Sequence, residues 1–259
     1  MSFGSASIYL STFLLEKNRW NGKGPSVQLT EWFEPAAEAG FRGLEIWSPH
    51  LYFTSRSDWD LLRIQSQETD LPVVFLDAGI PFDNSDKCRK QQDSLAEAAG
   101  FFAPQGIKFS PEALLPDNLS KAADWARDLP RDVFMVASFH ETPKPGVIPS
   151  LRRMLGSRFR CAFNPFAQSL KELEASLKEA ERTVINMGVR VNSGTKYFAL
   201  RDNPKSCEEV VALVRKLGFN GSWTLECTEG VGVPGEDMDA LFDESEEDMN
   251  YLTEVLSGK

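Results

Sequence analysis

The chain has 259 residues, 42% of them hydrophobic and 25% charged, which is enough for a folded domain with a sizeable core. Its formal net charge is −10, and such an acidic surface repels phosphates, which argues against nucleic acid as a partner. No apolar run approaches the roughly 18 residues of a membrane-spanning helix, so we expect no membrane segment.

Cysteine usage indicates a reducing compartment. The four cysteines lie far apart and form no Cys-x-x-Cys pair; they are Cys88, Cys161, Cys207 and Cys227. We therefore expect reduced thiols in a cytoplasmic protein, with neither a disulfide framework nor a zinc site. Residues 6–15 are apolar, but no basic segment precedes them and Glu16 and Lys17 follow, which favours a first strand over a signal peptide.

The hydrophobic period alternates eight times between strand-like and helix-like segments. We expect strands near residues 5–10, 43–47, 71–77, 106–110, 133–138, 159–164, 183–189 and 222–227. We expect helices near residues 27–39, 57–69, 85–99, 120–127, 148–155, 169–181, 207–216 and 238–256. A long loop over residues 190–206 is then left before the seventh helix. No linker rich in proline, glycine or serine divides the chain, so a single domain over residues 1–259 is the economical interpretation.

A Gly-Phe-x-Gly junction occurs near both ends of the chain. The first copy is Gly40-Phe41-Arg42-Gly43, before Leu44-Glu45-Ile46-Trp47, and the second is Gly218-Phe219-Asn220-Gly221, before Leu225-Glu226. Glycine ends a helix because it enters the left-handed region without steric cost, and an apolar strand then follows. The repeated junction predicts one βα unit repeated around an α/β barrel, the (β/α)8 TIM barrel. Glu226 then lies at the carboxyl end of a late strand, where such barrels do their chemistry.

This pattern resembles the xylose isomerase-like TIM barrels, a superfamily of sugar isomerases, sugar epimerases and metal-dependent AP endonucleases. The resemblance covers nearly the whole chain, and its most specific parts are the two junctions. The acidic charge balance favours the sugar-active branch, the sugar phosphate isomerases and epimerases. The resemblance therefore implies a TIM barrel that acts on a carbohydrate.

The resemblance also implies a divalent cation, Mg²⁺ or Mn²⁺, held by two glutamates, an aspartate and a histidine near the ends of strands five to eight. Glu226 stands where the last ligand belongs, but Ser138 replaces the strand-five acid and Asn164 the strand-six acid. Strand seven has no histidine, because the only two in the chain are His50 and His140. A carboxylate, an amide and a hydroxyl make a poor cage, so we expect an atypical or absent metal site, with Glu226 as a ligand only if a metal is bound.

Without a metal, removal of a proton next to a carbonyl needs a base, and the resulting enolate needs cations or hydrogen-bond donors. We predict Glu226 as the base and His140 as a proton shuttle, since the ordinary pKa of histidine lies near neutrality. Lys108 on strand four and Arg190 after strand seven are predicted to bind the phosphate or carboxylate of a sugar derivative. The alternative for Glu226 is a structural ion pair with one of these cations, and for His140 a cap on a carbonyl.

Further substrate-binding residues are expected near the strand ends. Glu45 and Trp47 lie on the same side of their strand and face the lumen if the strand alternates regularly. Glu45 is predicted to bind sugar hydroxyls with Trp47 or His50 as a neighbour, or else to form an internal ion pair. Asn164 and Phe166 complete the predicted set, and Phe166 with Trp47 would offer an apolar platform to a sugar ring.

Three functions remain open. The first is a sugar or sugar-acid isomerase, epimerase or lyase with altered metal chemistry or none. The second is a non-catalytic sugar-binding or scaffold barrel, which the residues at 138 and 164 favour. The third is a subunit of a hetero-oligomeric carbohydrate-active enzyme. The expected ligand is a small carbohydrate or sugar acid, and the sequence is compatible with a homo-oligomer.

Two further segments have compositions that suggest additional roles. The acidic segment 243–248 would suit a docking surface for a partner, but we predict that it is the solvated face of the last helix. The glycine-rich segment 230–235 after strand eight would either cradle a phosphate with backbone N–H groups or be a plain loop.

Overall fold

Eight parallel strands close into a barrel in the computed structural model, which describes residues 6–17, 19, 24–80, 82–83, 85–111 and 116–258. The order around the barrel is β1-β10-β7-β6-β5-β4-β3-β2, so strands that follow one another in the chain are neighbours. The barrel strands are β1 Ile8–Ser11, β2 Leu44–Trp47, β3 Val73–Asp77, β4 Gly106–Phe109, β5 Phe134–Phe139, β6 Phe159–Phe163, β7 Val184–Val189 and β10 Ser222–Leu225. The predicted (β/α)8 barrel is confirmed.

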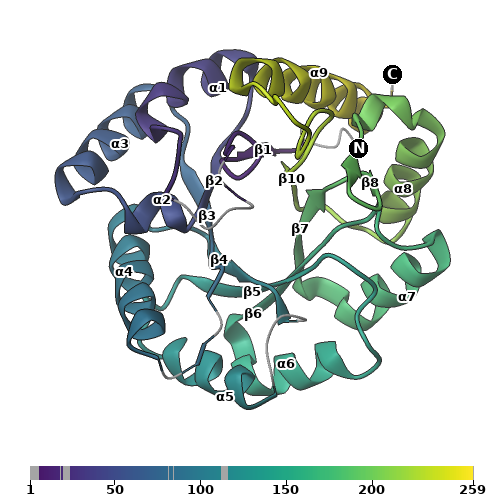
Figure 1. The fold of residues 1–259 in the computed structure, drawn as a ribbon. Coiled ribbons are helices and arrows are strands. Elements are labelled where there is room, and N and C mark those ends of the chain that lie inside the picture. The colour runs from purple at the N-terminus through teal and green to yellow at the C-terminus, as the bar shows by residue number, and fades with distance from the viewer. Residues whose placement is uncertain are drawn as a thin grey trace.

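Helices form a ring around these strands, and α9 closes the ring between α8 and α1 (Figure 1). The α-helices are α1 Phe33–Ala39, α2 Pro49–Tyr52, α3 Arg56–Glu68, α4 Asp86–Phe102, α5 Pro116–Trp125, α6 Val147–Leu155, α7 Leu170–Ala180, α8 Pro204–Lys216 and α9 Met238–Ser257. Short 3-10 turns accompany them at Leu29–Glu31, Gly156–Arg158, Glu181–Thr183 and Leu200–Asp202. The four cysteines are free and buried.

Both Gly-Phe-x-Gly junctions end a helix as predicted. Gly40 and Gly218 have φ angles of 100° and 79°, in the left-handed region that glycine enters without steric cost. The second glycine of each junction is needed because the next strand passes very close. A Cβ on Gly221 would lie 2.8 Å from the carbonyl carbon of Ile185 on β7, so a side chain there would push the two strands apart.

The structure departs from the prediction after β7. The expected loop over residues 190–206 contains a small antiparallel hairpin, β8 Asn192–Ser193 with β9 Lys196–Tyr197. Helix α8 also begins earlier than the predicted residue 207, at Pro204, because proline fits the first position of a helix, where its missing N–H is not needed.

Other boundaries also differ. The expected helix over residues 27–39 is a 3-10 turn followed by α1, and the short helix α2 after β2 was not predicted. Strand β1 begins at Ile8, and residue 5 of the predicted first strand lies outside the described residues.

Segment 243–248 of the last helix is a solvated face only in part, because Asp243 and Glu247 are exposed but two other residues are not. Ser245 and Asp248 are buried, and Asp248 accepts a 2.8 Å hydrogen bond from the backbone N–H of Leu200. Arg201 forms ion pairs with Asp248 and with the neighbouring glutamates of α9. The acidic side chains of α9 therefore hold the segment after the β8–β9 hairpin against this helix.

The strand register places charged side chains in the lumen near the carboxyl ends. Glu45 is paired with Phe75, and Asp77 with Lys108, so the members of each pair point to the same side of the sheet. Phe75 forms a small apolar cluster of its own with Val136 and neighbouring residues. The charged groups therefore lie above an apolar floor at the end of the barrel where TIM barrels carry their active sites.

Candidate active site

Lys108 is the centre of the charged cluster. It extends from β4 into the lumen, is 1% exposed, and forms an ion pair with Glu45 of β2. Its Nζ atom also donates a 3.2 Å hydrogen bond to Oε1 of Glu226, which directly follows β10. The ammonium lies 5.2 Å from the centre of the Phe75 ring, so a cation–π contact supports it from below. Burial alone would lower the pKa of Lys108, but the two carboxylates outweigh it and raise this pKa.

Glu226 is held by two cations. Its Oε1 accepts from Lys108, and its Oε2 accepts from Nε of Arg190 at 2.6 Å. The carboxylate has room because residue 188 on the neighbouring strand is glycine, where a Cβ would lie 2.7 Å from Cδ of Glu226. Burial alone would raise the pKa of Glu226, but Arg190 and Lys108 overcome it and hold this pKa well below its usual range.

Two other carboxyl groups behave in the opposite way. Burial raises the pKa of Glu45 to about 7, against the attraction of Lys108 and with added repulsion from Glu226. Burial also raises the pKa of Asp77, the last residue of β3, to about 6, against the attraction of Arg190. Glu226 is thus ionised at neutral pH, whereas Glu45 and Asp77 can exchange protons there.

His140 belongs to the same cluster. It is half-buried, and its Nδ1 atom is buried without a hydrogen-bond partner among the described residues. Burial and the nearby Arg190 lower the pKa of His140 to about 4, and Lys108 adds to this effect. The imidazole is therefore neutral at pH 7, with one unpartnered ring nitrogen beside the charged groups.

Asn164 positions the segment that carries Arg190. Its side-chain Nδ2 donates to the backbone carbonyl of Arg190 at 3.0 Å, and its Oδ1 accepts from the backbone N–H of Phe166 at 3.1 Å. Both ends of the amide are therefore engaged with the backbone. Phe166 itself is half-buried and packs against the core.

Aromatic rings lie beside Arg190. Its guanidinium carbon lies 5.5 Å from the centre of the Phe13 ring, and this ring meets Trp47 edge-on at 5.7 Å. Trp47 and Phe13 are both half-buried. Trp47, predicted as an apolar platform, is therefore linked to the charged cluster by Phe13, which contacts both Trp47 and Arg190. The sequence did not single out Phe13.

His50 lies in a separate buried network. Its Nδ1 is 3.1 Å from the hydroxyl of Thr12, and its Nε2 is 3.1 Å from Oε2 of Glu16. The Thr12 hydroxyl also accepts from the backbone N–H of Trp47 at 2.9 Å. All three network side chains are buried, and they join the segment after β1 to the segment after β2. The His50 ring meets Trp47 edge-on at 5.5 Å, and within the described residues its polar partners are Thr12 and Glu16 rather than the groups around Lys108.

The glycine-rich segment 230–235 faces an internal carboxylate. The backbone N–H of Gly232 donates to Oε2 of Glu236 at 2.6 Å, and Arg19 contacts the same oxygen at 2.5 Å. The N–H group of Gly232, one of those that would cradle a phosphate, is thus hydrogen-bonded to a carboxylate of the same chain.

The residues present do not fit a divalent cation. Both oxygens of Glu226 accept from cationic side chains, and the Asn164 amide is engaged at both ends. Over the described ranges there is no group of three or more histidine, cysteine, aspartate or glutamate side chains arranged to hold a metal. Ser138, which stands at the expected strand-five position, supplies only a neutral hydroxyl.

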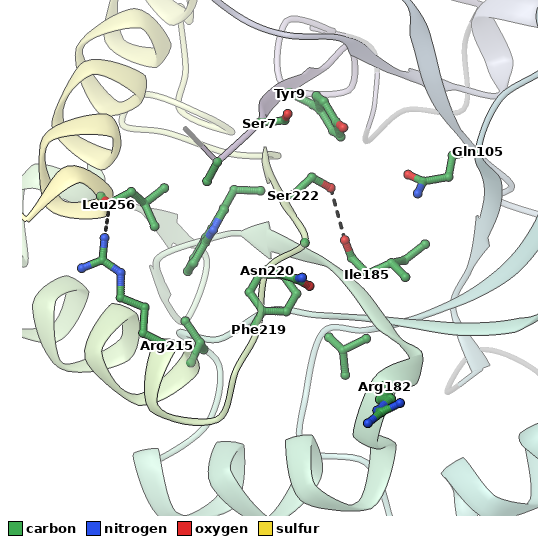
Figure 2. Close-up of a pocket in the computed structure, with 15 residues that line it drawn as sticks. Ser7, Tyr9, Gln105, Arg182, Ile185, Arg215, Phe219, Asn220, Ser222 and Leu256 are labelled. Atoms are coloured by element: carbon green, nitrogen blue, oxygen red, sulfur yellow. Dashed lines mark hydrogen bonds between the residues drawn. The ribbon is translucent and has the colours of Figure 1, made fainter. Parts of the chain in front are cut away.

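A cavity of about 610 Å³ lies at the other end of the barrel (Figure 2). It is lined by the amino-terminal ends of β1, β7 and β10. Figure 2 shows that the Ser222 hydroxyl donates a hydrogen bond to the Ile185 carbonyl and that the Arg215 guanidinium donates one to the Leu256 carbonyl. Of the described residues that line it, none is a carboxylate or a histidine. This cavity therefore lacks the groups for proton transfer that the opposite end has.

Neither a protein-family profile nor a curated protein sequence matches the chain. Solved structures do match in fold. D-Psicose 3-epimerase with D-tagatose from Clostridium cellulolyticum H10 has a TM-score of 0.71 at 12% identity, over 96% of this chain and 99% of that one. The 3-keto-D-glucoside 4-epimerase YcjR from E. coli, in its apo form, has a TM-score of 0.61 at 16% identity, over 95% and 99%.

A xylose isomerase-like TIM barrel protein from Mycobacterium smegmatis, solved in complex with magnesium, has a TM-score of 0.65 at 11% identity, over 99% of both chains. These similarities confirm that the chain has the xylose isomerase-like TIM barrel fold. At such low identity they show the fold alone.

None of the helices within the described ranges combines the length and apolar character needed to span a bilayer.

Proposed function

We propose that the protein is a sugar or sugar-acid isomerase or epimerase that transfers a proton next to a carbonyl group. The observation that carries this proposal is the cluster around Lys108, where Glu45 and Glu226 share one buried ammonium but differ in proton affinity. Neighbouring acids whose pKa values are pushed apart are typical of acid–base sites. The similarity in fold to two sugar epimerases supports a carbohydrate as the substrate.

Glu45 is the carboxyl group beside Lys108 whose raised pKa favours it for proton transfer. Its pKa of about 7 lets it accept a proton at neutral pH and return it, which is the optimum for a general base. Asp77 is a second carboxyl group suited to the same exchange. The prediction that Glu226 is the base remains untested. Its ion pairs with Lys108 and Arg190 lower its pKa and so make it the weaker base and the stronger anchor for the cations.

Arg190 and His140 are the groups best placed to meet a substrate. The Arg190 side chain is 20% exposed, and only its Nε has a polar contact among the described residues, so the outer N–H groups of the fork can bind a carboxylate or phosphate. His140 offers its unpartnered Nδ1 nearby. Trp47 and Phe13 give an apolar wall on the same side.

A non-catalytic sugar-binding barrel is the second candidate, and the closed ion pairs of Glu226 favour it. A screen of ketoses, keto-sugars and uronates for conversion by the purified protein separates the two. We expect one compound to be converted by wild-type protein and by Lys196→Ala, a control on the exposed β9, but not by Glu45→Gln. Binding of a sugar without conversion, equal in wild type and Glu45→Gln, would show that the protein is a binding barrel.

A further inference from the structure

We propose that the Lys108 ammonium, held between Glu45 and Glu226, takes the electrostatic role that a divalent cation has in other barrels, so that this site works without a metal. The inference rests on the proposed function, because it concerns the charge that develops during the same proton transfer. It makes a claim about ion binding that can be tested without any substrate.

The position of the ammonium supports the proposal. Lys108 reaches the lumen from β4 and is 1% exposed, so its charge is fixed by its surroundings rather than by solvent. One carboxylate lies on each side of Nζ, from β2 and from the segment after β10, and the Phe75 ring lies 5.2 Å away. A divalent ion coordinated by Glu45 and Glu226 together would have to displace this ammonium.

Arg190 blocks the other approach to Glu226. A metal ligand needs a lone pair directed at the ion, but Oε2 of Glu226 accepts from Nε of Arg190 at 2.6 Å while Oε1 accepts from Lys108. The Arg190 backbone is in turn fixed by the amide of Asn164. The two cations therefore neutralise the carboxylate that the resemblance predicted as a metal ligand.

The chemical step balances without a metal or a redox partner. A carboxylate removes the proton from the carbon next to the substrate carbonyl, and the C–H electron pair forms a carbon–carbon double bond. The carbonyl π pair moves to its oxygen, and the ammonium and the guanidinium stabilise this negative charge. Return of a proton to the opposite face of the same carbon re-forms the carbonyl and gives epimerisation. Return of a proton to the former carbonyl carbon, with the neighbouring hydroxyl proton passing to the former carbonyl oxygen and a new carbonyl forming at the neighbouring carbon, gives isomerisation.

Binding of Mn²⁺ tests the proposal. Calorimetric titration and electron paramagnetic resonance would compare the wild type, Lys108→Ala and the double variant Lys108→Ala with Glu226→Gln. Lys196→Ala, which removes an exposed lysine from β9, is the matched control. We expect no stoichiometric Mn²⁺ on the wild type or the control, a gained site in Lys108→Ala, and its loss in the double variant.

Two results would overturn the proposal. One is near-stoichiometric Mn²⁺ on the wild type that Glu226→Gln removes. The other is a folded Lys108→Ala protein, judged by circular dichroism, that gains no Mn²⁺ site. If Lys108→Ala does not fold, Lys108→Gln, which keeps most of the volume without the charge, takes its place under the same criteria. Failure to find any sugar substrate would defeat the proposed function but would leave the outcome of this titration unchanged.

Discussion

Lys108 and Glu226 are 118 residues apart in the chain and meet inside the barrel, with Nζ 3.2 Å from Oε1. This contact joins the fourth and the last barrel strands across the lumen. It also fixes the charge state of the site, because a buried carboxylate and a buried ammonium each keep their charge only with such a partner. Because Lys108 and Arg190 are both paired with Glu226, their attraction does not offset the effect of burial on Glu45 and Asp77, and the pKa values of these two carboxyl groups stay raised.

Replacement of Glu45 by glutamine should lower turnover by about 100-fold or more, because general acid–base catalysis typically contributes that much. The amide keeps the shape of the side chain but cannot accept a proton. Steady-state kinetics on the substrate found by the screen would measure this. Unchanged turnover in Glu45→Gln, together with loss of turnover in Glu226→Gln, would assign the base to Glu226 instead.

The pH dependence should report Glu45 directly. Its pKa is raised to about 7, so below this pH the carboxyl group is protonated and cannot accept the substrate proton. We therefore expect kcat/KM to fall as the pH is lowered through about 7. A pH profile of the wild type, with Lys196→Ala as a control, would check this. A profile that stays flat down to about pH 5 would exclude Glu45 as the base.

His140 should make the fold less stable in acid. Its pKa is lowered from 6.5 to about 4, so between these values the unfolded chain takes up a proton that the folded protein resists. Through this window His140 should lower the free energy of unfolding by at most about 3 kcal/mol, while the raised pKa values of Glu45 and Asp77 act in the opposite direction. Urea unfolding at several pH values would measure the loss. The free energy of unfolding of the wild type should fall relative to that of His140→Gln as the pH is lowered, and parallel pH profiles of the two proteins would contradict the assignment.

Gly188→Ala should damage the site. The added Cβ would lie 2.7 Å from Cδ of Glu226, so the carboxylate must move away from Lys108 and Arg190. We expect a loss of roughly 1–3 kcal/mol in unfolding free energy and a fall in turnover. Gly100→Ala in the last turn of α4, where a Cβ meets no atom within 4 Å, is the matched control and should be neutral or stabilising. Equal effects of the two variants would show that residue 188 has no special role.

Asn164→Ala should loosen Arg190. The side-chain amide bonds the Arg190 carbonyl and the Phe166 N–H, and its loss leaves both groups without that partner. We expect a cost of roughly 1–3 kcal/mol in unfolding free energy and a higher KM for an anionic substrate. Asn164→Asp keeps the hydrogen-bond acceptor but not the donor, so its unfolding free energy and its KM should lie between those of the wild type and Asn164→Ala. A KM unchanged in both variants would indicate that Asn164 does not position Arg190.

The fold was predictable because it depends on local signals. A helix that ends at glycine, followed by an apolar strand, can be identified from a few consecutive residues, and two copies such as Gly40 and Gly218 indicate a repeated unit. The boundaries were less certain where local signals compete. Pro204 begins α8 earlier than expected, and the β8–β9 hairpin has strands too short to show a hydrophobic period.

The site was predictable only in part. The sequence pointed to five charged or titratable residues on or just after barrel strands, and the structure brings them together. They are Glu45, Lys108, His140, Arg190 and Glu226. Their pairing depends on contacts between distant segments, which no spacing in the sequence encodes.

The residues that the sequence did not reveal act through such contacts. Asp77 is the last residue of β3, so its place at a strand end was a usable signal. Phe13 and Gly188 carry no such signal, because one packs on Arg190 from the segment after β1 and the other only makes room for Glu226. His50 was expected near the substrate, but a buried network with Thr12 and Glu16 engages both of its ring nitrogens.

Solvent exchange of the substrate proton tests the central claim most directly. Chelator-treated protein would be incubated in D₂O with the sugars and sugar acids of the screen, and loss of the proton signal next to the carbonyl would be followed by NMR. We expect deuterium incorporation by the wild type that persists after chelation and disappears in Glu45→Gln. Incorporation that stops on chelation and returns with Mg²⁺ or Mn²⁺, or that is unaffected by Glu45→Gln, would contradict it.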